Sequence, residues 1–130
     1  MNLEGRKISP GQAGGRALVS AMGISFFGGV DPESGVVVEN GHDLQGQCVS
    51  GRVLVFPTGK GSTVGSYTLY RLKKAGKAPA AIINREAETI TAVGAIISDI
   101  PCVDQIAVEN IPNGIFLQVN ADLGRVEWDG

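Results

Sequence analysis

Two short apolar runs, each followed by a helix-like segment, constrain the fold of this chain most. The first is RVLVFP, residues 52–57, and the second is PAAIIN, residues 79–84. Uninterrupted apolar runs of this length, bounded by proline, are typical of strands buried on both faces. We therefore predict a strand–helix–strand–helix unit at the centre of the chain.

More strand-like segments flank this centre. They are GRKISPG (residues 5–11), GRALVS (15–20) and VVVE (36–39) on one side, and DQIAVE (104–109), GIFLQVN (114–120) and RVEWD (125–129) on the other. The first helix is expected to start at Ser62 or Thr63 as N-cap and to end before Gly76, and the second is expected within residues 85–101. The pattern predicts a mixed α/β domain with a closed or half-closed, barrel-like β structure and two main helices.

The composition limits the classes of function. The 130 residues fit one domain, residues 1–130, and the net charge of −2 disfavours nucleic acid as the main partner. No apolar run is long enough to span a bilayer and no signal-peptide pattern opens the sequence, so we expect no membrane association and a cytoplasmic location. The two cysteines, Cys48 and Cys102, and the one histidine, His42, are too few for a structural zinc site or an iron–sulfur cluster, and both thiols are expected to be buried.

The loop TGKGST, residues 58–63, carries the strongest hint of chemistry. It does not match a Walker phosphate loop, because Lys60 is followed by Gly61 and no glycine stands at the required place before it. Glycines at 59 and 61 would still allow a ligand close to the backbone, and the following helix N-terminus would attract an anion. A capped helix start explains the same residues, and local pattern alone favours that interpretation.

Other residues leave alternatives open. A Ser–His–Asp arrangement of Ser62 with His42 and Asp43 is conceivable, but a structural role for His42 in its loop is the simpler interpretation. Phe26 and Phe27, in the glycine-rich segment before Asp31, fit a partner-facing loop and core positions equally well.

Three segments taken together resemble the small subunit of the aconitase X family, in its archaeal two-subunit form. They are FPTGKGSTVGSYTLY (residues 56–70), GGVDPESG (28–35) and AAIINREAE (80–88), and the resemblance runs along nearly the whole chain. It implies a swivelling β/β/α domain that pairs with a large subunit carrying an iron–sulfur cluster, expected to be of the 4Fe-4S type. The implied reaction is loss of water from (R)-5-phosphomevalonate, giving trans-anhydromevalonate 5-phosphate on a modified mevalonate route to isoprenoids.

The resemblance also assigns roles in the loop. It makes Ser62 the catalytic base, with Gly59, Lys60, Gly61 and Thr63 supporting the loop or contacting substrate. A serine hydroxyl is a weak base, so loop N–H groups, the helix N-terminus and Lys60 would have to stabilise its alkoxide.

One position departs from aconitase itself, in which an arginine that binds substrate follows the matching serine. Thr63 stands there in this chain, so that arginine's role does not carry over. Arg85 is a candidate for the missing positive charge. The alternative interpretation is that Arg85 is a surface arginine or is held in an ion pair. Glu86 and Glu88 are expected to be solvated carboxylates in a first helical turn.

Two other functions remain compatible with the sequence. A non-catalytic, anion-binding or regulatory module would use the same loop to hold a phosphorylated or carboxylated ligand. A dehydratase subunit of the same family could act on another hydroxy acid, such as a hydroxyproline-type substrate.

Overall fold

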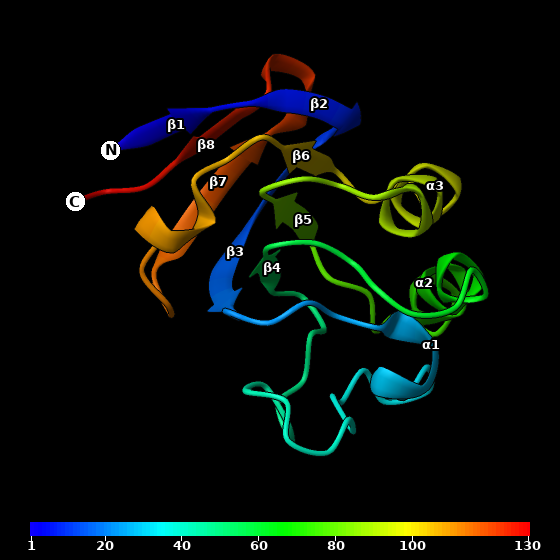
Figure 1. Ribbon diagram of the computed structural model, residues 1–130. Helices are drawn as coiled ribbons and strands as arrows, with labels where there is room; N and C mark the ends of the chain where they lie inside the picture. Colours follow the sequence, from blue (N-terminus) through cyan, green and yellow to red (C-terminus); the bar gives the residue numbers. More distant parts are fainter.

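Eight strands form one mixed sheet in the computed structural model, which describes residues 1–130 (Figure 1). The strands are β1 (Asn2–Glu4), β2 (Arg6–Ser9), β3 (Gln12–Val19), β4 (Val53–Phe56), β5 (Ala81–Asn84), β6 (Cys102–Asp104), β7 (Phe116–Asn120) and β8 (Arg125–Glu127). The helices are α1 (Phe26–Gly29), α2 (Gly65–Lys74) and α3 (Thr89–Ile97), with 3-10 turns η1 (Val108–Asn110) and η2 (Ala121–Leu123).

The strand order β1-β8-β7-β3-β4-β5-β6-β2 places the first two strands at opposite ends of the sheet. Only Gly5 separates β1 from β2 in the chain, so one N-terminal segment pairs with β8 through its first half and with β6 through its second. The sheet therefore curls into the half-closed, barrel-like form that the sequence predicts. At the turning point the N–H of Gly5 donates to the carbonyl of Gly124 at 2.8 Å.

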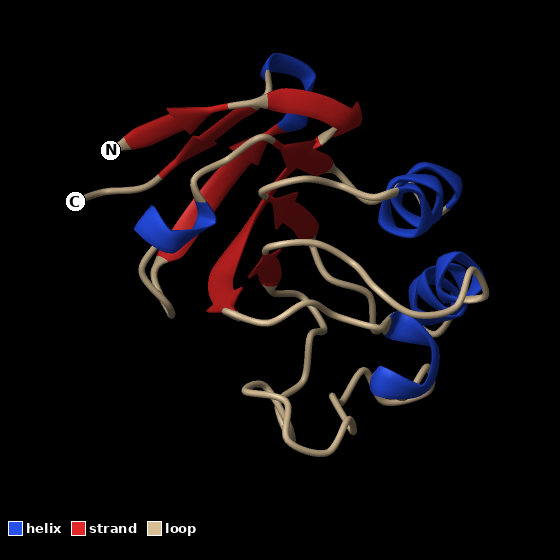
Figure 2. Cartoon of the chain, in the orientation of Figure 1, coloured by secondary structure: helices blue, strands red, loops and turns tan.

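Four neighbouring strands, β3 to β6, run parallel, while β1, β2, β7 and β8 pair antiparallel with their neighbours. Helices α2 and α3 follow β4 and β5 and lie together on one face of the sheet (Figure 2). The molecule therefore has three layers: the curled sheet forms two layers of strands, and α2 and α3 form a third layer on its outer face. The two apolar runs from which β4 and β5 were predicted are buried on both faces, as expected for strands that lie between two layers.

Alternate residues of the central strands face two separate cores. Leu54, Phe56 and Ile82 point to the helices and pack with Leu69 and Leu72 of α2. The intervening residues point into the curled sheet and belong to a second core, which includes Val53, Val55, Ile83, Val103, Leu117, Val119, Val126 and Trp128. The period-two alternation of a strand thus supplies both cores from the same short segments.

Most of the predicted elements are confirmed, and two predicted strands are wrong. Residues 36–39 form no strand: Val36 and Val37 make only isolated bridges, to Cys48 and Val30, within a long excursion between α1 and β4. The strand predicted over residues 104–109 ends at Asp104, because Gln105 adopts a positive φ of 60° that turns the chain into η1.

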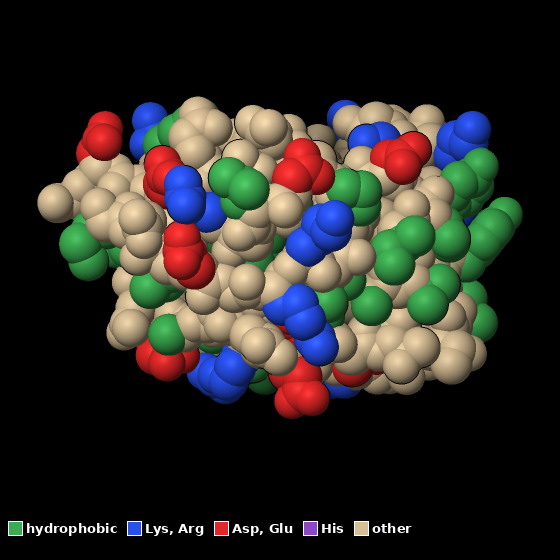
Figure 3. Space-filling view, turned by 90° about the horizontal axis from the view of Figure 1, so that it is seen from above, with side chains coloured by type: hydrophobic (Ala, Val, Ile, Leu, Met, Phe, Trp, Pro, Cys, Tyr) green, Lys and Arg blue, Asp and Glu red, His purple; other side chains and the backbone are tan.

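The surface carries both charge signs and one apolar region. Figure 3 shows hydrophobic side chains gathered on the right, the side on which the helices lie in Figure 1. The outward face of α3 contributes exposed Val93, Ile96 and Ile97. No helix of the chain is long and apolar enough to cross a membrane.

Candidate active site

The glycine loop lies where the parallel strands end. Residues 57–64 follow β4, between the segments that follow β3 (residues 20–25) and β5 (residues 85–88). In open α/β sheets, ligands bind beyond the carboxyl ends of parallel strands. The fold therefore places the loop at the edge of the sheet where a binding site is expected.

The loop is held on one side by the segment after β3. The N–H of Ile24 donates to the carbonyl of Thr58 at 3.2 Å, and the N–H of Lys60 donates to the carbonyl of Ile24 at 2.9 Å. Gly59 sits between these two bonds as the partner of Ile24 in a parallel bridge. This extension of the β3–β4 pairing fixes the path of the loop before it reaches Ser62.

Gly61 makes the sharp turn that follows. Its φ is +89°, and a Cβ at this position would collide with the hydroxyl oxygen of Ser25. Ser25 is itself fixed, since its Oγ donates to the carbonyl of Phe27 at 3.0 Å. Only glycine suits both the backbone conformation and the close approach of Ser25.

Ser62 is exposed at the start of α2. Its Oγ accepts the N–H of Val64 at 3.1 Å, and its carbonyl accepts the N–H of Gly65 at 2.9 Å. The N-cap of the regular helix is Val64, one or two residues later than the sequence predicts, but the Ser62 hydroxyl does accept an N–H of the first turn. Capping and exposure of the same hydroxyl are therefore compatible.

The backbone N–H groups of Gly61, Ser62 and Thr63 donate to no acceptor within the chain. They lie in succession just before the positive end of α2. Such a run of free donors at a helix N-terminus favours an anion. The loop thus offers the Ser62 hydroxyl and three free N–H groups within a few residues of each other.

Lys60 does not stand free beside Ser62. Its Nζ lies 3.1 Å from Oε2 of Glu39, in the excursion between α1 and β4. The positive charge expected to support Ser62 is therefore shared with a carboxylate.

Thr63 is exposed, and its carbonyl accepts the N–H of Ser66 at 3.3 Å as α2 begins.

Arg85 forms an ion pair, as one of the two alternatives predicts. Its guanidinium lies 2.9 Å from Oε2 of Glu109, and that hydrogen bond holds the pKa of Glu109 below its ordinary value. The pair borders a hollow of about 320 Å³ that Ser20 and Pro57 also line. Arg85 thus lies at the carboxyl end of the sheet, with its charge already engaged.

His42 and Asp43 are structural. The carboxylate of Asp43 accepts the hydroxyl of Ser20 at 2.6 Å and the N–H of Ala21 at 2.9 Å. The buried ring of His42 accepts the N–H of Leu44 at Nδ1 and meets the carbonyl of Gly23 at Nε2. These bonds tie the long excursion to the segment after β3, and Asp43 pairs with Ser20 instead of serving Ser62.

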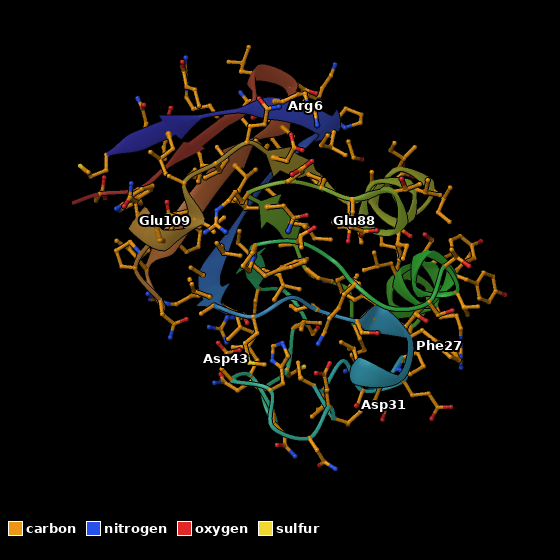
Figure 4. The ribbon with its side chains drawn as sticks, in the orientation of Figure 1. Arg6, Phe27, Asp31, Asp43, Glu88 and Glu109 are labelled. Atoms are coloured by element: carbon orange, nitrogen blue, oxygen red, sulfur yellow. The ribbon has the colours of Figure 1, made fainter.

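Glu88 has a structural role at the start of α3. The prediction of a solvated carboxylate is wrong, because Glu88 is the N-cap of α3 and accepts the N–H groups of Ile90 at 2.8 Å and Thr91 at 2.7 Å. Figure 4 shows it beside α3, between that helix and the end of β5. A polar residue directly before an apolar helical run was the available signal.

The residues of this chain do not fit an iron–sulfur cluster or a structural metal. Burial raises the pKa of the Cys102 thiol to about 12, so it stays protonated inside β6, while Cys48 is exposed, contrary to the prediction that both thiols are buried. No three His, Cys, Asp or Glu side chains gather into a possible metal site.

Comparison with known proteins defines the class to which this fold and loop belong. The model of the aconitase X swivel domain matches residues 2–128. The crystal structure of Thermococcus kodakaraensis aconitase X, in its holo form, superposes with a TM-score of 0.98 at 55% identity and covers 100% of this chain and 99% of that one. The chain belongs to the aconitase X family, as its swivel domain.

Curated relatives narrow the comparison further. The phosphomevalonate dehydratase small subunit of Thermococcus kodakarensis is 57% identical over 127 residues, which are 98% of this chain and 96% of that protein. The protein of the same name from Methanosarcina acetivorans is 55% identical over 130 residues, with 98% and 90% covered. A UPF0107 protein solved by NMR in solution superposes with a TM-score of 0.88 at 47% identity, with 100% of both chains covered.

Proposed function

We propose that this chain is the small subunit of a hydro-lyase that dehydrates (R)-5-phosphomevalonate to trans-anhydromevalonate 5-phosphate. The relatives that carry the name phosphomevalonate dehydratase small subunit support the substrate over another hydroxy acid. The same name supports a large subunit as partner. A cytoplasmic location stays a prediction.

The observation that carries the proposal is the position of Ser62 Oγ. It is exposed beyond the parallel strands and accepts the N–H of Val64 at the positive end of α2. A donor aimed at this oxygen, together with the helix dipole, stabilises the alkoxide form that a serine base requires.

In the proposed reaction Ser62 Oγ takes a proton from the carbon next to the substrate carboxylate. The electron pair of that C–H bond forms the new double bond, and the hydroxyl on the neighbouring carbon departs with the electron pair of its C–O bond as hydroxide. This hydroxide and the proton taken up by Ser62 are together the water that the reaction releases. An iron–sulfur cluster on the large subunit would supply Lewis acidity for the departing hydroxyl. The free N–H groups of Gly61 and Thr63 are placed to hold negative charge at the loop.

Dehydration of phosphomevalonate by the anaerobically assembled pair of subunits tests the proposal. We expect Ser62→Ala to assemble normally and to lower kcat by about 10² to 10⁴, the usual contribution of a positioned base. Ser34→Ala is a suitable control, since Ser34 Oγ donates to Asp31 at 3.0 Å in a turn outside the loop. Full activity of an assembled Ser62→Ala complex would refute the role of Ser62.

The free donors of the loop also support a second function, anion binding without catalysis. Titration of the chain with inorganic phosphate, followed by backbone amide shifts, addresses this alternative. Shifts confined to residues 58–66, together with a serine variant that turns over normally, would favour a regulatory module.

A further inference from the structure

Gly59 lies directly against the first turn of α3. A Cβ at this position would collide with two side-chain oxygens, Oε1 of Glu88 and Oγ1 of Thr91. The hydrogen that glycine carries there points at both oxygens, which is the arrangement of a weak Cα–H···O contact. Gly59 is therefore needed for close approach, although its own φ does not lie in the left-handed region.

The two oxygens belong to side chains that are themselves fixed. The carboxylate of Glu88 accepts two N–H groups of its own helix, Ile90 at Oε2 and Thr91 at Oε1. The chain just before it is anchored too, because the N–H of Ala87 donates to the buried carboxylate of Asp104 at 3.0 Å. The surface that Gly59 meets is thus rigid.

Thr91 has no structural reason to be polar. Its side chain is fully buried, and Oγ1 finds no hydrogen-bond partner in the chain. A buried hydroxyl without a partner costs stability, and valine would fill the same space without that cost. Gly59, in the loop that leads to Ser62, is a close neighbour of this oxygen.

The opposite side of Gly59 is equally constrained. The bridge to Ile24 holds the residues before and after Gly59 through hydrogen bonds of 3.2 and 2.9 Å. The loop is therefore clamped at Gly59, between the segment after β3 and the first turn of α3. Ser62 follows three residues later, beyond the turn at Gly61.

We propose that Glu88 and Thr91 are positioning residues for Ser62, which they act on through Gly59. Their oxygens set how far the loop stands from α3, and so where Ser62 Oγ lies relative to the substrate. The proposal rests on the proposed role of Ser62. A displacement of about 1 Å in such a group lowers turnover by up to about 10², so small changes at the clamp become measurable.

Two conservative variants separate positioning from helix stability. Glu88→Asp keeps a good N-cap but is one methylene shorter, so its carboxylate withdraws from Gly59. Thr91→Val keeps the volume and removes the unpartnered oxygen. We expect each to leave the melting temperature of the chain unchanged or higher, and to lower kcat of the assembled enzyme about tenfold or more with little change in KM.

Backbone amide shifts of the chain give a readout that does not depend on turnover. We expect both variants to move the signals of residues 59–64, with Thr91→Ser close to wild type in shifts and in kcat. Unmoved loop signals would overturn the proposal, as would moved signals with unchanged kcat while Ser62→Ala is inactive. If Ser62→Ala itself were fully active, the role of Ser62 as base would fall and the positioning proposal would fall with it, whereas the dehydratase function would stand.

Discussion

Arg6 and Asp104 meet in a two-pronged ion pair across the closing edge of the sheet. Nε of Arg6 lies 3.0 Å from Oδ1, and a terminal nitrogen lies 2.8 Å from Oδ2. The carboxylate is fully buried, while the guanidinium is half exposed. Figure 4 shows Arg6 on the N-terminal segment at the top of the sheet. Since Asp104 also accepts the N–H of Ala87, one side chain joins the N-terminal segment to the loop that leads into α3.

Asp104→Asn should destabilise the chain by about 2 kcal/mol, because charge-assisted hydrogen bonds to a buried carboxylate are replaced by neutral ones. Urea unfolding measures the change. Glu4→Gln is the matched control, since the pair of Glu4 with Arg125 is exposed and should contribute less than about 1 kcal/mol. Equal effects of both variants would contradict the structural role of Asp104.

Lys60→Ala should lower turnover of the assembled enzyme less than Ser62→Ala does, by under about tenfold. The ammonium is half exposed and paired with Glu39, so much of its field is already neutralised before substrate arrives. The measurement is kcat of both variants under one set of conditions. A Lys60→Ala enzyme as impaired as Ser62→Ala would contradict this expectation and would show that the ammonium contributes to turnover despite its pair with Glu39.

Phe27→Ser should weaken assembly with the large subunit without unfolding the chain. Phe26 is buried in the core, as one of the two alternatives predicts, whereas 52% of Phe27 is exposed near the start of α2, so Phe27 is a candidate for the partner-facing role. Loss of an aromatic contact at an interface commonly costs about 1 to 2 kcal/mol, or about five- to thirtyfold in Kd. Affinity for the purified large subunit would reveal it, and an unchanged Kd would place Phe27 outside the interface.

The two thiols should react very differently. Iodoacetamide at pH 8 should modify exposed Cys48 and spare Cys102, whose raised pKa of about 12 keeps it neutral. Since the unfolded thiol ionises near pH 8.5 and the folded one does not, stability should fall as the pH rises between those values. Mass spectrometry after native and denaturing alkylation checks the selectivity, and a Cys102→Ala variant should lose the alkaline slope.

Elements whose own residues are almost all apolar, or end at a clear helix stop signal, could be predicted from the sequence. The runs that form β4 and β5 are almost entirely apolar. Helix α2 ends at Lys74, and Gly76 follows its C-cap with a φ of +72°, which suits the position after a helix. Residues 36–39 carry the same β-branched signal but lie in an excursion where no long strand is available to pair with them. A high strand propensity means that side chains pack well on a sheet, but a strand forms only where a neighbouring strand is available to pair with it.

The residues of the candidate site also fall into two groups, those that a sequence motif reveals and those that only the fold brings together. Ser62 and its glycines are adjacent in the chain, so a motif can carry them. Glu88 and Thr91 reach Gly59 only because β4 and β5 are neighbours, a relation that local pattern does not contain. The engagement of Lys60 by Glu39 depends likewise on how the long excursion folds back.

The segment that runs from β1 through Gly5 to β2 also affects the tendency of the chain to aggregate through its sheet edges. The long strand β3 lies inside the sheet, and the two outermost strands are only three and four residues long. Unpaired strand edges are the usual templates for intermolecular β-aggregation. By leaving only such short edges, this chain can expose apolar residues on α3 and still resist edge-to-edge association in solution.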